Sequence, residues 1–147
     1  MEMRTMDLLE LLGERHSQLR RLAEERWAAH SDIEISNSEW LILAKIGEGE
    51  PTIANVAKQV GITRQATHKL IKKMVAKELV EVNDAEDNKK VKRVRLSKLG
   101  KQCFEENNGL KAELEQELEG VIGAGQVERL KTILSMDWNV EKPGTGE

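Results

Sequence analysis

Apolar residues recur every three, four and seven positions along much of the chain, which is the spacing of an amphipathic helix. Residues 6–29 carry it as a row of leucines separated by Glu and Arg: Leu8, Leu11, Leu12, Leu19 and Leu22. Two later stretches, about 97–120 and 126–137, carry it again. The pattern predicts one long helix at the start of the chain and two helices near its end.

Capping residues divide the middle of the chain into shorter elements. Ser36 and Glu39 have the spacing of a capping box, in which each side chain accepts a hydrogen bond from the other residue's backbone N–H. Thr52 and Thr63 are candidate N-caps, and Gly61 between them is typical of the turn after a helix. We therefore expect a second helix after Ser36, a short third helix after Thr52, and a fourth helix from Thr63 to about residue 77.

Two stretches of alternating β-branched residues, 79–83 and 91–96, predict two strands. The polar residues between them, 84–90, predict the tip of a hairpin. Two short helices around a glycine turn form a helix-turn-helix, and a hairpin directly after the second helix is a wing. The predicted fold class is mainly α with a small β-hairpin: a winged helix-turn-helix flanked by N- and C-terminal dimerisation helices.

The terminal helices predict a homodimer. The two C-terminal helices each have an apolar stripe: Leu110, Leu114, Leu118 and Val121, then Val127, Leu130, Ile133 and Leu134. Amphipathic helices outside a compact winged helix need a partner for their apolar faces, although packing on one another is the alternative. The expected organisation is an N-terminal dimerisation helix at 1–31, a winged helix-turn-helix DNA-binding domain at 32–101, C-terminal dimerisation helices at 102–138, and a disordered tail at 139–147.

Charge is distributed unevenly along the chain. Between Thr63 and Lys101 there are 12 Lys or Arg and 5 Asp or Glu, a net charge of +7, whereas the whole chain carries −3. A basic block in an otherwise acidic chain is typical of a protein with a polyanionic partner. With three Trp, one Phe and no Tyr, the chain has too few rings for a stacking platform that binds single-stranded nucleic acid.

The predicted fourth helix has two faces of different chemistry. On a helical wheel, one face is apolar apart from a threonine: Ala66, Thr67, Leu70, Ile71 and Met74. The other face carries only cations, an amide and an imidazole: Arg64, Gln65, His68, Lys69, Lys72 and Lys73. Because a solvated helix normally mixes charges of both signs, a polar face without a carboxylate favours contact with phosphates.

The N-terminal end of a recognition helix lies deepest in the major groove of DNA. Arg64 matches the O6 and N7 acceptors of guanine, and Gln65 matches the edge of adenine. Thr63 and Thr67 are further candidate contacts at this end. Three lysines lie further along and are expected to meet phosphates: Lys69, Lys72 and Lys73. His68 is a candidate DNA contact too, although a hydrogen bond to the protein's own backbone explains it equally well.

The predicted wing is basic. Because alternate residues of a strand face opposite sides, we expect Val94 and Leu96 to face the core and Arg93 and Arg95 to face outward. Three lysines at or near the tip are candidate DNA contacts: Lys89, Lys90 and Lys92. A charged edge strand also protects against aggregation, so part of this charge has a second explanation.

The stretch from Ile35 to Gly100 resembles the MarR family of winged-helix transcriptional regulators. Residues 56–80, which read VAKQVGITRQATHKLIKKMVAKELV, are similar to the family's recognition region LAxxLGVSRSTVTRLVDRLEEKGLV, with Glu78 in place of its last glycine. The wing signature DxRxxxxxLTxxG is similar to Asp87-Asn88-Lys89 and Leu96-Ser97-Lys98-Leu99-Gly100, at a spacing about one residue longer.

The resemblance implies a homodimer, a wing cation that reaches the minor groove (Lys89 or Lys90 here), and a small aromatic ligand between the dimer helices and the DNA-binding lobe. Residues that could line such a pocket are His16, Arg20, Trp27 and Trp40, although helix packing explains the tryptophans equally well. Some family members sense oxidants by cysteine. We expect Cys103 to be a buried structural thiol, because reactive thiols need an exposed electropositive setting.

These patterns predict a sequence-specific double-stranded-DNA-binding transcriptional regulator, a ligand-responsive homodimeric repressor on a pseudo-palindromic operator. The alternative is a helical dimeric protein-interaction module whose basic lobe docks an acidic protein partner. We expect no enzyme, metal site or cofactor, because no nucleophile–base pair, phosphate loop or metal cluster is recognisable. The absence of an apolar signal segment or of a span of about 20 apolar residues predicts a cytoplasmic protein without a membrane partner.

Overall fold

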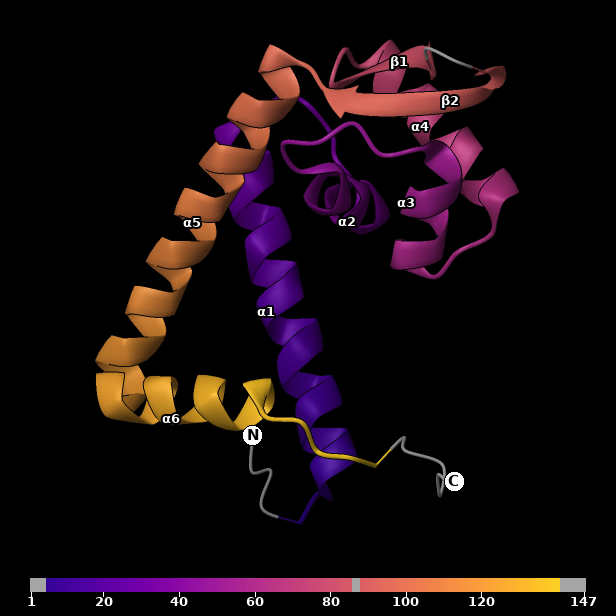
Figure 1. The fold of residues 1–147 in the computed structure, drawn as a ribbon. Helices are drawn as coiled ribbons and strands as arrows, with labels where there is room; N and C mark the ends of the chain where they lie inside the picture. Colours follow the sequence, from indigo (N-terminus) through magenta and orange to yellow (C-terminus); the bar gives the residue numbers. More distant parts are fainter. Residues whose placement is uncertain (1–4, 86–87, 141–147) are drawn as a thin grey trace. The chain divides into compact units, whose positions relative to one another are not determined.

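The computed structural model describes residues 5–85 and 88–140. The chain divides into two compact units, Met1–Leu110 and Lys111–Glu147. The elements in chain order are α1 (Leu8–His30), α2 (Asn37–Ile46), α3 (Ile53–Val60), α4 (Arg64–Ala76), β1 (Val80–Ala85), β2 (Asn88–Leu96), α5 (Lys98–Ile122) and α6 (Ala124–Ser135). This order confirms the predicted fold class, a mainly helical chain with a winged helix-turn-helix between terminal helices (Figure 1).

The predicted caps begin the predicted helices. Ser36 and Glu39 form a capping box at the start of α2, where the Glu39 N–H donates to Ser36 Oγ at 3.1 Å and the Ser36 N–H donates to Glu39 Oε1 at 2.8 Å. Thr52 caps α3 and Thr63 caps α4, each accepting from a backbone N–H three residues on. Gly61 has φ 81°, a left-handed conformation that glycine adopts without steric cost.

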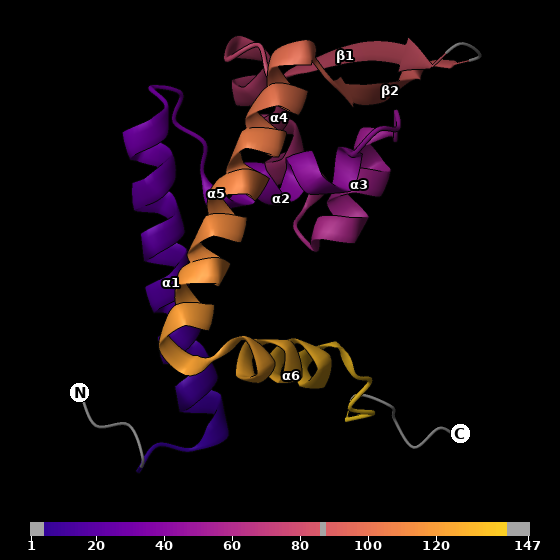
Figure 2. The same ribbon diagram turned by 90° about the vertical axis from the view of Figure 1, so that its left-hand side faces the viewer.

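The hairpin is longer than the sequence predicts. Strands β1 and β2 pair antiparallel from Val80↔Leu96 to Asp84↔Lys92, with a register irregularity before Ala85↔Asn88. The prediction that 84–90 is a tip is therefore wrong for most of these residues, and residues 86–87 lie outside the described part of the chain. Figure 2 shows the hairpin extending past α3 as a wing.

The segment just before α3, Pro51 and Thr52, pairs with strand β2. The Val94 N–H donates to the Pro51 carbonyl at 3.0 Å, and Thr52 forms an isolated bridge with Arg93. The same β2 residue, Val94, is fully buried in the core together with Ile42, Leu43, Met74 and Leu79. The wing is therefore anchored on the helix-turn-helix at the edge where α3 begins.

The start of α5 packs directly on the end of the helix-turn-helix. Ser97 Oγ accepts from the Gly100 N–H at 2.9 Å and donates to the Glu78 carbonyl at 2.6 Å. A Cβ at Gly100 would overlap with the carbonyl oxygen of Leu79, so the close approach of the two backbones requires glycine at this position. This contact explains why the serine and glycine of the wing signature occur together.

Residues 111–140 form the described part of the second unit, with the end of α5, Gly123 as the helix junction, and α6. The Lys131 ammonium contacts Glu115 Oε1 at 2.8 Å, which ties α6 to α5. Eight large apolar side chains of this unit are exposed: Val121, Ile122, Leu130, Ile133, Leu134, Met136, Trp138 and Val140. Apolar groups so numerous on a short segment are typical of a surface that binds a partner.

Candidate nucleic-acid interface

The two faces of α4 are those that the sequence predicts. Thr67, Ile71 and Met74 are buried, while Ala66 and Leu70 are half-buried. All six residues of the opposite face are exposed: Arg64, Gln65, His68, Lys69, Lys72 and Lys73. The α4 helix therefore presents to solvent a surface that carries donors and positive charge and no carboxylate.

A groove of about 290 Å³ lies between the N-terminal half of α4 and the wing. It is lined by Thr52, Ile53, Ala54, Arg64, His68, Lys90, Val91 and Lys92. Four predicted DNA contacts, two from α4 and two from β2, thus meet in one hollow. Among the described lining residues none is acidic, so the groove attracts an anion.

The pleat of β2 explains why Lys92 faces this groove. Lys92 and Val94 alternate along the regularly paired part of the strand and so point to the same side. Val94 is fully buried on that side, against the helix-turn-helix core. Beyond the core the same face continues to Lys92, and Lys90 and Val91 line the groove from the irregularly paired residues that precede it. Alternation from a buried valine was therefore the sequence signal for Lys92.

The two wing arginines, Arg93 and Arg95, form hydrogen bonds within the protein. Arg93 and Arg95 are exposed, as predicted. The Arg93 guanidinium donates to the Glu50 carbonyl at 3.0 Å, and Arg95 Nε donates to Glu81 Oε1 at 2.7 Å. The hydrogen bond and charge of Glu81 raise the pKa of Arg95 above its usual value. These two side chains stabilise the wing on the faces away from the groove.

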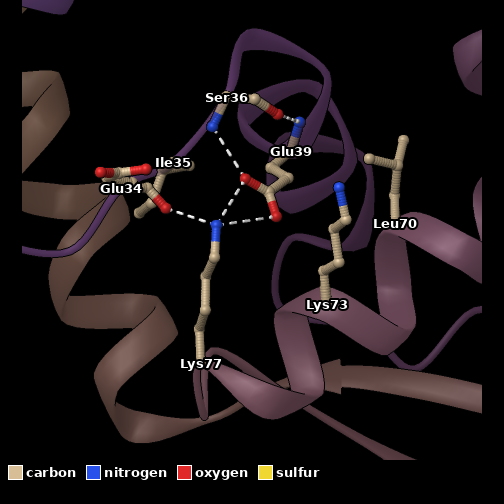
Figure 3. Close-up of a pocket in the computed structure, with 7 residues that line it drawn as sticks. All are labelled: Glu34, Ile35, Ser36, Glu39, Leu70, Lys73 and Lys77. Atoms are coloured by element: carbon tan, nitrogen blue, oxygen red, sulfur yellow. Dashed lines mark hydrogen bonds and ion pairs between the residues drawn. The ribbon is translucent and has the colours of Figure 1, made fainter.

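The opposite flank of α4 faces a second hollow, of about 350 Å³ (Figure 3). Its lining residues are Glu34, Ile35, Ser36, Glu39, Leu70, Lys73 and Lys77. Arg64 and Lys73 are nine residues apart, which at 3.6 residues per turn places them about 180° apart around the helix. Lys73 is therefore on the side of α4 away from the wing groove, and Gln65, Lys69 and Lys72 lie between the two flanks.

One predicted contact on α4 is wrong. Thr67 is fully buried, and its hydroxyl donates to the Thr63 carbonyl at 2.9 Å. A threonine on the packing face satisfies its hydroxyl within the helix and cannot reach a base. Thr63 itself is exposed, with its Oγ1 accepting from the Ala66 N–H. The side chain of Lys89, the predicted wing-tip cation, lies outside the described residues, so its role stays a prediction.

The tryptophans proposed for a ligand pocket form a packing contact. Trp27 is 4% exposed and meets Trp40 edge-on, with ring centroids 5.0 Å apart. Its indole N–H donates to the Ile33 carbonyl at 2.7 Å. Helix packing accounts for this contact, and the ligand pocket stays a prediction. His16 and Arg20 are exposed on α1, and Arg20 pairs with Glu24 on the same helix.

Cys103 is the buried thiol that the sequence predicts. It is 2% exposed in the core, where burial, with a smaller contribution from the charge of Glu106, raises its pKa. On the next turn of α5, Glu106 accepts from His30 Nε2 at 2.9 Å and ties the end of α1 to α5. Hydrogen bonds from Gln102 and His30 hold the pKa of Glu106 below its ordinary value.

No cluster of three or more His, Cys, Asp or Glu side chains is placed to hold a metal ion within the described ranges. No helix in the same part of the chain has the length and apolarity to cross a membrane.

Known proteins have the same architecture. The model of the MarR family matches residues 33–90. Among solved structures, the fold is similar to apo MarR from E. coli, with a TM-score of 0.73 and 22% identity over 89% of this chain and 96% of that chain. It is also similar to MepR, a transcription regulator of the Staphylococcus aureus multidrug efflux pump MepA, with a TM-score of 0.72 and 17% identity over 88% and 94%.

A third similar structure is a mutant MarR from E. coli complexed with operator DNA, with a TM-score of 0.71 and 21% identity over 90% of this chain and 94% of that chain. None of the curated proteins matches the chain. A helix-turn-helix followed by an anchored hairpin, with a cation-lined groove between them, defines a winged-helix protein. Residues 33–90 thus match the MarR family model, and the solved structures of MarR and MepR share the winged helix-turn-helix fold of this chain.

Proposed function

We propose that this protein is a cytoplasmic, sequence-specific regulator that binds double-stranded DNA as a homodimer on a pseudo-palindromic operator. The observation that carries the proposal is the groove in which Arg64 and His68 of α4 meet Lys90 and Lys92 of the wing. A phosphate backbone supplies the negative charge that this surface lacks. The complex of a similar MarR structure with operator DNA supports the same partner.

Residues at different positions along α4 have different proposed roles. Arg64 and Gln65 begin α4 and are exposed, so they are the candidates for base edges in the major groove. Lys69 and Lys72 lie one and two turns later on the exposed face and are candidates for phosphate contacts. The wing contributes Lys92, Lys90 and, from the resemblance of its signature, Lys89.

A second copy of the chain is the partner proposed for the terminal segments. The exposed apolar side chains of α6 and the residues after it, such as Leu134 and Trp138, lack cover within the described part of their own unit. In the first unit, Leu8 and Leu9 at the start of α1 are exposed as well. The proposed organisation keeps the DNA-binding domain at 32–101 and assigns 1–31 and 102–138 to dimerisation, with 139–147 as a tail.

Repression would follow from occlusion of a promoter by the bound dimer. A small aromatic ligand that changes the separation of the two recognition helices would relieve it, because each α4 must match its own half-site. The alternative is that the basic lobe binds an acidic protein. The same cations would then contact carboxylates, and no DNA base would be recognised.

A gel shift with genomic fragments at moderate salt, competed with excess unrelated duplex, separates the two functions. A regulator of DNA gives a band that survives competition on a small set of fragments, and Arg64→Ala removes that selectivity. An interaction module gives either no shift or one that unrelated duplex removes from every fragment alike.

A further inference from the structure

Among the described residues of the wing, a cross-strand ion pair lies on each face. Asp84 is the register partner of Lys92, and the Lys92 ammonium contacts the Asp84 carboxylate. Glu81 is the register partner of Arg95 on the opposite face, with Arg95 Nε 2.7 Å from Glu81 Oε1. The pairs are alike in charge, strand position and exposure, since all four side chains are between 44% and 51% exposed.

Only one of these two pairs borders the proposed DNA interface. Lys92 lines the groove with Arg64 and His68, whereas Arg95 is on the side of the hairpin away from it. Asp84 therefore places a carboxylate beside a groove whose described lining residues include no acid. A cross-strand pair stabilises a hairpin on either face, so hairpin stability does not by itself require an acid on the groove side.

We propose that Asp84 limits the affinity of this protein for DNA, by holding Lys92 in an internal ion pair that a phosphate must replace. The inference rests on the proposed function and concerns the strength of the same interface. When a phosphate approaches Lys92, the Asp84 carboxylate is left beside the polyanion. It then either repels the phosphate or retains a cation from solution, and both outcomes reduce the net gain of the contact.

The consequence is a lower affinity for any duplex, whatever its sequence. Lys92 is proposed to contact phosphate and not base edges, so the ion pair with Asp84 weakens binding to random DNA equally. A regulator must dissociate from such non-specific DNA to reach its operator. A half-exposed pair exchanges partners at small cost, so the restraint weakens Lys92 without blocking it. Asp84 thus keeps non-specific binding low while Arg64 and Gln65 retain the reading of bases.

The test compares Asp84→Asn with Glu81→Gln in the full-length protein, since both remove one negative charge from β1. Binding to a fluorescein-labelled random-sequence duplex is measured by anisotropy over a series of salt concentrations. We expect Asp84→Asn to bind about two- to fivefold tighter for each protomer. We expect its salt dependence to steepen by up to about one unit for each protomer, because one more counterion is released. Glu81→Gln is expected to shift affinity less than about twofold and to leave the slope unchanged.

A double-mutant cycle isolates the pair itself. In a Lys92→Met background, Asp84→Asn is expected to lose most of its effect, because no lysine remains to be released. Asp84→Glu, which keeps the charge and the pairing, is expected to bind as wild type and guards against misfolding of Asp84→Asn. Equal shifts for Asp84→Asn and Glu81→Gln, or weaker binding by Asp84→Asn than by Asp84→Glu, would overturn the inference alone. Failure of the wild type to bind any duplex would overturn the proposed function with it.

Discussion

The ammonium of Lys77, just after α4, lies 3.0 and 3.1 Å from the two carboxylate oxygens of Glu39 in the first turn of α2. Glu39 is 2% exposed and already accepts from the Ser36 N–H as part of the capping box. Lys77 donates as well to the Glu34 carbonyl at 2.5 Å (Figure 3). One buried carboxylate therefore begins α2 and holds the end of the recognition helix against it.

Loss of Lys77 is expected to destabilise the protein strongly. Lys77→Met leaves the Glu39 carboxylate buried without a counter-charge, which costs about 3–5 kcal/mol for a fully buried pair. Because Lys77 keeps about a third of its side-chain surface in water, we expect a smaller loss, about 2–4 kcal/mol. The measurement is the free energy of unfolding from urea denaturation.

Lys73→Met is the matched control, since Lys73 borders the same hollow one turn earlier and is exposed. Its effect is expected to stay within about 0.5 kcal/mol. Glu39→Gln combined with Lys77→Met is expected to recover part of the loss, because the buried side chain is then neutral. A Lys77→Met variant as stable as Lys73→Met would show that the buried carboxylate finds another partner.

A second stability prediction concerns Glu78, which connects α4 to β1 with φ 62°. This left-handed conformation favours glycine, because a Cβ there crowds the following carbonyl. The MarR recognition region has glycine at the matching position. We expect Glu78→Gly to stabilise the protein by about 1 kcal/mol, which for a chain of this size is a rise of about 2–4 °C in melting temperature.

Glu78→Ala tests the cause of that effect. Alanine removes the same charge but keeps the Cβ, so it is expected to leave the melting temperature close to that of wild type. If alanine stabilises as much as glycine, the gain comes from the charge and not from the backbone conformation.

The thiol of Cys103 is expected to resist modification in the native protein. It is 2% exposed and its pKa is raised, so both access and thiolate fraction are low. Reaction with iodoacetamide at neutral pH, followed by mass spectrometry, is expected to be slow until denaturant unfolds the chain. Labelling at the same rate with and without denaturant would instead indicate an accessible, activated thiol.

Local chemistry made most of the helices predictable from sequence. Ser36, Glu39, Thr52 and Thr63 begin their helices through hydrogen bonds within four residues, and so their effect does not depend on the rest of the fold. The length of the wing was missed for the opposite reason. Asp84 looks like a turn residue by composition, but it is paired by a charge eight residues away across the hairpin.

The exposed face of each element in the candidate site was predictable from sequence, but the way these faces come together was not. The exposed face of α4 followed from its period, but period alone could not show that Thr67 satisfies its own hydroxyl within the helix. The placement of Lys92 beside Arg64 depends on tertiary packing, since Val94 must be buried before the rest of β2 is carried past α4. The link between Lys77 and Glu39 is equally tertiary and spans 38 residues.

The proposed dimer predicts that a charge on α6 changes the mass of the particle in solution. Leu134 is 49% exposed within its own unit, so Leu134→Asp has little to disrupt in the single chain but would bury a carboxylate in a dimer interface. We expect wild type to sediment as a dimer at micromolar concentration and Leu134→Asp as a monomer. Leu41→Asp, on a similarly exposed leucine of α2, is the control and is expected to remain dimeric. A wild-type particle with the mass of one chain would count against the second copy as partner.

The last prediction separates two kinds of contact on one helix. Arg64 begins α4 and lines the wing groove, where its guanidinium can reach base edges. Lys72 lies two turns later on the exposed face, where the helix is expected to leave the major groove. Arg64→Ala is therefore expected to cost about 1–3 kcal/mol on the best operator and to relax preference at one base position in each half-site. Lys72→Ala is expected to weaken good and poor sites alike and to reduce the salt slope by roughly one unit for each phosphate that the lysine neutralises.

Selection of bound sequences from a random duplex pool, carried out with wild type and both variants, measures the two effects together. Because each change acts once in each protomer, the affected bases should form a symmetric pair, with half-site centres about 10–10.5 base pairs apart. Gln65→Ala is expected to resemble Arg64→Ala at a neighbouring position, since both side chains are exposed at the same end of α4. If Lys72→Ala altered base preference while Arg64→Ala left it intact, the C-terminal half of α4 would be the part that enters the major groove of DNA. The protein groove between α4 and the wing would then need another role.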